Sequence, residues 1–194
     1  ADDTSALELQ VYQAILERRP TPTISRLKEI LAKPDPALGY LNGELRFWLG
    51  WAQEVTGDQA AAKESWRQAR SELEFFLEGD PTNFLLIRAL ALSNMGLGNK
   101  SVALALAERN MAAVPLEKDA TLGPVAVDTF ARVAAQVGEP DRAIAALEKL
   151  LSIPSSTLSL NLTLPPALLP PAPPCDPLRT DPRPHNLPHS SLTQ

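Results

Sequence analysis

The chain has 194 residues, 44% of them hydrophobic and 21% charged, with a formal net charge of −5 at pH 7. These values are typical of a soluble globular protein. The acidic balance argues against nucleic acid as the main partner, because phosphate binding needs a basic face. No run of about 18 apolar residues occurs, so we expect no direct insertion into a membrane. The compartment stays open between the cytoplasm and the extracytoplasmic part of a larger membrane protein.

Residues 1–153 show the periodicity of helices throughout. Apolar residues recur at spacings of three and four, as in the stripe of Leu45, Trp48, Leu49 and Ala52, and one buried helix face requires this spacing. No segment alternates apolar and polar residues between turn signals, so an all-α fold without a sheet is predicted. The helices are expected at 5–18, 23–33, 38–56, 59–79, 82–97, 100–113, 121–137 and 141–151.

Three glycines mark turns inside helical hairpins. Gly57, Gly98 and Gly138 each follow an apolar helix and precede another, and glycine accepts the left-handed conformation that ends a helix. Asp58 and Asn99 are candidate caps of the helices that follow. Asp80-Pro81 gives a similar cap-then-proline signal between two hairpins.

The turn glycines are 41 and 40 residues apart, and a fixed period of this size indicates a solenoid. Each unit also has a small residue seven positions before the glycine and an alanine five positions after it. This pattern resembles the tetratricopeptide repeat, with a degenerate fourth unit from about residue 6 to 34. The resemblance implies a right-handed superhelical stack of about four helical hairpins over residues 1–153.

A different composition begins at residue 154. Residues 154–194 hold eleven prolines and four charged residues, and prolines block helix propagation. We therefore predict a proline-rich, non-helical C-terminal tail. Its segment Asp176–Arg183, together with 108–123 and 138–154, resembles the C-terminal repeat region of bacterial multidomain signalling proteins. Those proteins carry a serine/threonine kinase, an adenylate cyclase or a winged-helix regulator, and the activities of those domains do not carry over to this chain.

In tetratricopeptide proteins the first helices of successive hairpins line a concave ligand groove. The resemblance therefore implies a partner-binding groove in this chain. Its predicted residues are Glu44, Phe47, Trp51 and Glu54 in the first unit, Arg88, Leu92 and Met95 in the second, and Asp128, Arg132 and Gln136 in the third.

Two alternatives stay open for these groove residues. Phe47 and Trp51 either anchor a peptide or pack against a neighbouring hairpin. Arg88 and Arg132, one repeat apart, either hold a carboxylate or form salt bridges within the protein, as Arg132 could with Asp128 four residues before it. Trp48 and Trp66 lie on core stripes and are expected to be buried.

No sequence feature indicates an enzyme, a cofactor or a metal site. Cys175, His185 and His189 lie in the proline-rich tail, where nothing fixes their geometry for catalysis. The function expected is a protein- or peptide-binding scaffold that acts through the concave face, as the sensory or assembly region of a larger signalling protein. The alternative is a structural module that self-associates, with its groove filled by its own tail or by a second copy.

Overall fold

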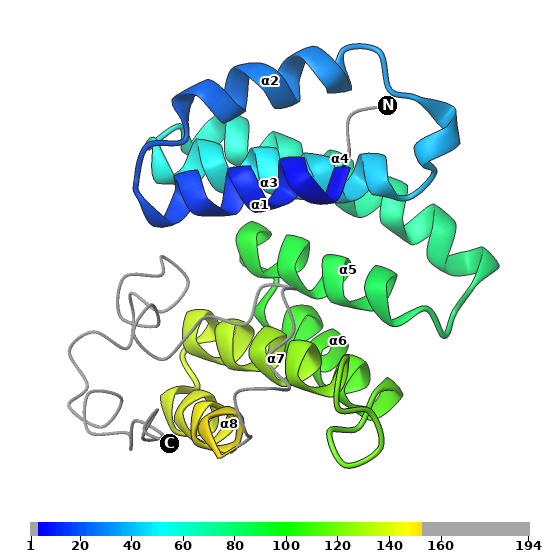
Figure 1. Cartoon of the computed structure of the whole chain (residues 1–194), viewed down its shortest axis with the longest axis vertical. Coiled ribbons are helices and arrows are strands. Elements are labelled where there is room, and N and C mark those ends of the chain that lie inside the picture. The colour runs from blue at the N-terminus through cyan, green and yellow to red at the C-terminus, as the bar shows by residue number, and fades with distance from the viewer. Residues whose placement is uncertain (1–3, 153–194) are drawn as a thin grey trace, which may run out of the picture. The chain divides into compact units, whose positions relative to one another are not determined.

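A computed structural model describes residues 4–152, and these form helices and no β-strand (Figure 1). The all-α prediction is therefore confirmed for this part of the chain. The α-helices are α1 (Thr4–Leu16), α2 (Thr21–Leu31), α3 (Leu41–Val55), α4 (Gln59–Gly79), α5 (Phe84–Leu97), α6 (Lys100–Ala113), α7 (Gly123–Val137) and α8 (Pro140–Leu151), with a 3-10 turn at Pro36–Leu38. None of these helices is long and apolar enough to cross a membrane.

The chain divides into two compact units between Ala103 and Leu104, inside α6. Unit 1 contains α1 to α5, and unit 2 contains most of α6 with α7 and α8. The tail predicted from residue 154 onward lies outside the described residues. The superhelical stacking of all the hairpins stays a prediction from the repeat.

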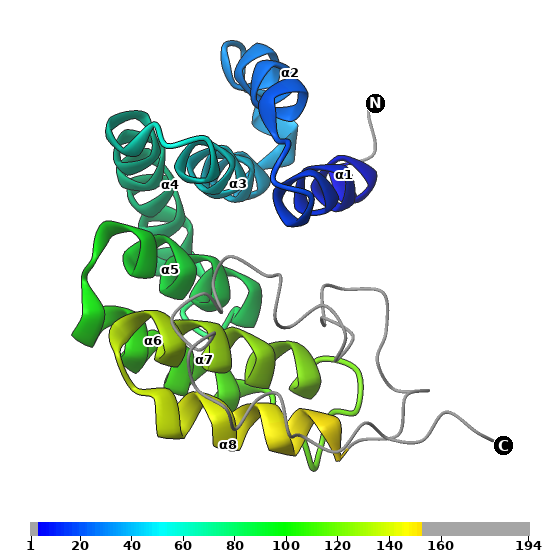
Figure 2. The ribbon, with the colours of Figure 1, turned by 90° about the vertical axis from the view of Figure 1, so that its left-hand side faces the viewer.

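Helix α3 is the centre of unit 1, where it packs against α1, α2, α4 and α5. Figure 2 shows these helices around α3. The most deeply buried tryptophan of the unit is Trp66 on α4, which is 2% exposed. Its ring fills the space beside two glycines, Gly50 on α3 and Gly96 on α5, because a Cβ on either would lie 2.5 Å from the indole. A large residue thus packs where the neighbouring helices offer small ones.

Unit 2 is held together by packing of α8 against α7 and by charged contacts. Ala143, Ile144 and Leu147 of α8 are buried. The guanidinium of Arg142 lies 4.9 Å from the ring centre of Phe130 on α7 and pairs with Glu108 of α6 at 2.5 Å. A cation over an aromatic face gains electrostatic attraction. The α8 helix is therefore fixed by an apolar stripe with a polar edge.

The predicted turn glycines have the expected conformation. Gly57, Gly98 and Gly138 have φ of 87°, 80° and 94°, and Asp58 accepts a hydrogen bond from the Ala61 N–H as a helix cap. Most helix starts differ from the prediction by one to three residues, and two of these shifts have a visible local cause. Residues 36–38 form a separate 3-10 turn, so that α3 begins at Leu41. The α5 helix begins at Phe84 because the side chain of Asn83 accepts hydrogen bonds from free N–H groups in the first turn of the helix.

Candidate functional site

Four polar residues lie close together on the neighbouring helices α1, α3 and α5 of unit 1. They are Glu8 on α1, Tyr40 and Glu44 at the start of α3, and Arg88 on α5, and we call them the carboxylate–arginine cluster. Glu44 Oε1 lies 3.9 Å from Arg88 Nη1. Because α3 contacts both α1 and α5, the first helices of three successive hairpins contribute to this cluster.

The residues of the cluster are buried or half-buried, and one buried donor among them lacks an acceptor in the described residues. Glu44 is 7% exposed, and its 3.9 Å contact with Arg88 is longer than a hydrogen bond. Arg88 Nε is buried without an acceptor in the described part of the chain. Buried polar groups in folded proteins nearly always have partners. The buried Arg88 Nε without an acceptor therefore favours a site that receives a ligand.

Burial and mutual repulsion shift the protonation of the carboxyl groups. Burial, followed by the charge of Glu44, raises the pKa of Glu8 to about 7, while Arg88 acts in the opposite direction. Burial also raises the pKa of Glu44, again against the effect of Arg88. The pKa of Tyr40 is raised by burial and then by both carboxylates. One arginine thus faces two carboxyl groups, and near neutral pH the cluster can exchange a proton.

An aromatic cluster lies beside the polar groups on the same helices. Tyr12 of α1 lies 5.9 Å from Trp48 and 6.1 Å from Trp51, measured between ring centres. Trp48 and Trp51 are stacked at 5.4 Å, and Phe47 contacts both rings. All four side chains are buried. This apolar surrounding lowers the local dielectric constant and strengthens electrostatic interactions of the polar cluster.

The predicted groove residues of unit 1 share this region but differ in exposure. Phe47 and Trp51 are buried in the aromatic cluster, which is the packing alternative that the sequence left open. Arg88 and Met95 are half-buried and Glu54 is exposed. Leu92 and Glu44 are buried. The polar groups of the predicted face thus remain the best candidates for ligand contact.

The remaining predicted groove residues lie on α7 in unit 2. Arg132 Nε is 2.8 Å from Asp128 Oδ2, and both side chains are buried. This is the intrahelical pair that the four-residue spacing allowed. Gln136 is exposed. A role of this pair in holding a partner's carboxylate stays a prediction.

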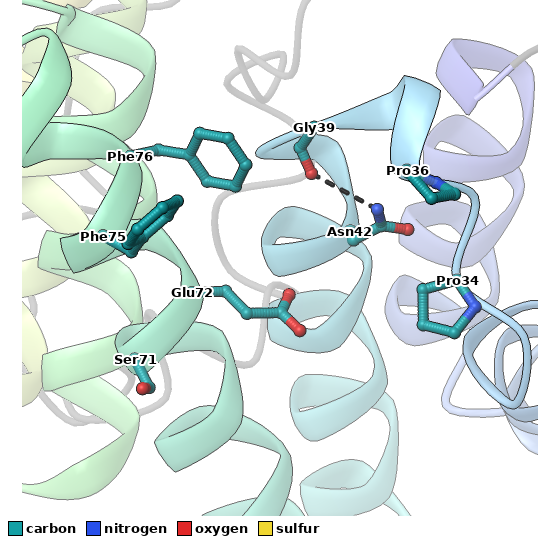
Figure 3. A pocket seen from close by; sticks show the side chains of 8 residues that line it. All are labelled: Pro34, Pro36, Gly39, Asn42, Ser71, Glu72, Phe75 and Phe76. Carbon is teal, nitrogen blue, oxygen red and sulfur yellow. Dashed lines mark hydrogen bonds between the residues drawn. The ribbon is translucent and has the colours of Figure 1, made fainter.

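A pocket of about 430 Å³ lies elsewhere on unit 1, between the α2–α3 connection and α4 (Figure 3). Phenylalanine rings and a carboxylate approach it from α4, and prolines from the connection face them. Its lining residues are Pro34, Pro36, Gly39, Asn42, Ser71, Glu72, Phe75 and Phe76.

Neither a protein-family model, nor a curated protein, nor a solved structure matches this chain. Within residues 4–152 no group of three or more His, Cys, Asp or Glu residues is placed to hold a metal ion. Cys175, His185 and His189 lie outside the described residues.

Sequence reasoning missed Glu8, Tyr12 and Tyr40 as members of the site. A signal was present, because Glu8 and Tyr12 are four residues apart, as are Glu44 and Trp48. Both pairs place an acid and an aromatic residue on one helix face. The resemblance to the repeat is weakest in the first hairpin, and no turn glycine gave the register that would align the two pairs.

Proposed function

We propose that the protein is a peptide-binding scaffold that holds an extended segment of a partner against the face formed by α1, α3 and α5. The observation that carries this proposal is the Glu44–Arg88 pair on that face, in which Glu44 is buried, Arg88 is half-buried and Arg88 Nε has no acceptor in the described part of the chain. The tetratricopeptide-like repeat of the sequence supports the same face, since solenoid proteins bind along surfaces that successive repeats share.

The chemistry of the pair suits a peptide backbone. Each residue of an extended peptide presents one N–H donor and one C=O acceptor. The carboxylate of Glu44 can only accept, and the guanidinium of Arg88 can only donate. The two groups are 3.9 Å apart, so that a backbone amide could satisfy both. The neighbouring aromatic rings limit the access of water and strengthen these charge-assisted hydrogen bonds.

The proposal can be tested with peptides selected from a random displayed library on the full chain. Their dissociation constants are then measured for the wild type and for the double variant Glu44→Gln/Arg88→Gln. This variant removes both charges of the pair together, so that neither Glu44 nor Arg88 is left as a charge without its partner. We expect binding to weaken by about tenfold or more, as for the loss of charged hydrogen bonds. Arg67→Gln, at an exposed ion pair with Glu64 on α4, is the matched control.

Two results would contradict the proposal: a library that yields no binding peptide, or selected peptides that bind the folded double variant as tightly as the wild type. Melting curves of each variant show whether it is folded. The alternative function, self-association, predicts instead a concentration-dependent dimer in sedimentation experiments that the double variant loses. The tail leucines Leu158–Leu168, whose position would distinguish the two functions directly, lie outside the described residues.

A further inference from the structure

We infer that the pocket between the α2–α3 connection and α4 binds the side chain of a lysine or an arginine, presented by an extended segment of a partner protein. The pocket shares no residue with the carboxylate–arginine cluster. The inference therefore adds a second binding site and does not depend on the proposed function.

The walls of the pocket suit the apolar stem of a basic side chain. Phe75 is 69% exposed, and its ring meets that of Phe76 edge to face at 5.4 Å. Pro34 and Pro36 form the opposite wall (Figure 3). Lysine and arginine bury their methylene groups along such surfaces while the charged head stays in a polar environment. A cation over an exposed phenyl ring is also attracted by the ring electrons.

The buried polar atoms of the pocket require a donor. Glu72 Oε1 accepts from Arg46 Nε at 2.8 Å, whereas Oε2 is buried without a partner in the described part of the chain. Asn42 is 7% exposed, and its Oδ1 also lacks a donor there. The Asn42 amide nitrogen already donates to the Asp35 and Gly39 carbonyls, which fixes the orientation of the amide. These acceptors lie beneath the pocket surface, and a small shift of either side chain would let an occupant donate to them; ammonium and guanidinium groups only donate.

The surrounding charge selects a cation. Around the pocket Glu72 pairs with Arg46 and Glu74 with Arg70. The flanking residues 33–42 and 70–80 then leave three further carboxylates, Asp35, Glu78 and Asp80, against the single basic residue Lys33. An excess of one sign around a hollow raises the local concentration of the opposite charge. A purely apolar ligand would neither neutralise this negative charge nor donate a hydrogen bond to Glu72 Oε2 or Asn42 Oδ1.

The wall is also fixed before binding. Asp35 accepts a hydrogen bond from the Ala37 N–H at the start of the 3-10 turn, and Asn42 holds the two ends of that turn. Gly39 has φ of +53°, a conformation that favours glycine and ends the turn. A preformed wall reduces the entropy lost on binding.

The test uses the full chain, labelled with ¹⁵N, and the capped peptide Gly-Pro-Arg-Pro-Gly as probe. The same peptide with lysine, citrulline or norleucine in place of arginine gives the comparison. With the arginine and lysine peptides we expect saturable changes in the amide chemical shifts of the non-proline residues in 34–42 and of residues 71–76. The citrulline and norleucine peptides should bind about tenfold more weakly, because they lack the charged donor.

Two variants separate this site from a general attraction of basic peptides. Phe75→Ala changes an exposed side chain, so the variant should fold and yet bind the arginine peptide about tenfold more weakly. Glu72→Gln should do the same, while Glu74→Gln, exposed on the same helix but outside the lining, should bind as the wild type does. Arg88→Gln should also leave this binding unchanged.

Three results would overturn the inference: equal binding of the norleucine and arginine peptides, unchanged binding by folded Phe75→Ala, or no shift changes at millimolar arginine peptide. Because the Glu44/Arg88 variants leave this pocket intact, failure of the proposed function would not alter these results.

Discussion

Trp66 connects three helices of unit 1 with a single side chain. Its ring is 2% exposed and lies against glycines of α3 and α5, so truncation would leave a cavity that rigid helices cannot close. We expect Trp66→Ala to lower the free energy of unfolding by about 3–5 kcal/mol, the range for buried large aromatic residues. Urea denaturation followed by circular dichroism measures this change. A loss below about 1 kcal/mol would contradict the packing described.

The glycine beside this ring gives the converse prediction. A Cβ at Gly50 would lie 2.5 Å from Trp66 Nε1, and a buried indole cannot move aside as a flexible chain end would. Gly50→Ala should therefore cost about 1–3 kcal/mol of stability, as overpacking does. Gly79→Ala is the matched control, since no atom lies within 4 Å of the added Cβ, and it should be neutral or slightly stabilising. In a Trp66→Ala background, the cost of Gly50→Ala should largely disappear.

Glu8 predicts a pH dependence of stability. Its pKa is about 7 in the folded protein, against an ordinary value of 4.5, mainly because of burial and then because of the charge of Glu44. Arg88 lowers this pKa in part, and Tyr40 lies nearby. Between about pH 4.5 and 7 the folded state therefore binds more protons at this group than the unfolded state does. As the pH rises through this window, Glu8 lowers the free energy of unfolding. Glu8→Gln should match the wild type near pH 4 and exceed its unfolding free energy by about 1–3 kcal/mol at pH 8.

Denaturation curves across pH 4–8 test this prediction. Exposed Glu17, just after α1, serves as the control, and Glu17→Gln should stay within about 0.5 kcal/mol of the wild type. If the free energy of unfolding changed with pH in the same way for Glu8→Gln and the wild type, Glu8 would not be buried beside Glu44.

At the scale of elements, the sequence predicted helix positions well because local rules decide them. The apolar period and the glycines at 57, 98 and 138 marked hairpins whose turns have the expected positive φ. The start of α5 was misplaced because Asp80-Pro81 has a strong cap signal, whereas Asn83, three residues later, makes the bonds. The carboxylate–arginine cluster escaped prediction because it depends on how α1, α3 and α5 face each other.

Asn83 provides a test of the α5 start. Its Oδ1 accepts from the Leu85 and Leu86 N–H groups at 3.1 and 3.3 Å. We expect Asn83→Ala to lower the unfolding free energy by about 1 kcal/mol, the usual cost of losing an N-cap. Thr82→Ala, which loses only an exposed bond to Asp80, should cost less than about 0.5 kcal/mol. Equal effects of the two changes in urea denaturation would place the helix start elsewhere.

At the scale of the whole molecule, the packing of α1 and α5 against α3 explains why polar groups of separate helices meet without a local motif. Residues one hairpin apart in the chain, such as Glu44 and Arg88, become neighbours when first helices pack side by side. The superhelical stack of all hairpins stays a prediction, and the period read from the sequence indicates which helices would form a shared face. It does not predict which side chains on that face stay accessible. The sequence therefore did not decide whether Phe47 and Trp51 are buried, and the structure shows that they are.

The last prediction concerns the distal end of the chain. Residues 175–194 hold four prolines and few apolar side chains, so we expect their removal to take little apolar burial from the fold. A truncation after Pro174 should therefore keep the helical circular dichroism and melt cooperatively within a few degrees of the full chain. In contrast, a truncation after Val137 removes α8 and with it the buried residues Ile144, Leu147 and Leu150. That variant should lose cooperativity and bind a hydrophobic dye. If the chain that ends at Pro174 also behaved as a molten species, residues 175–194 would have to be part of the folded core.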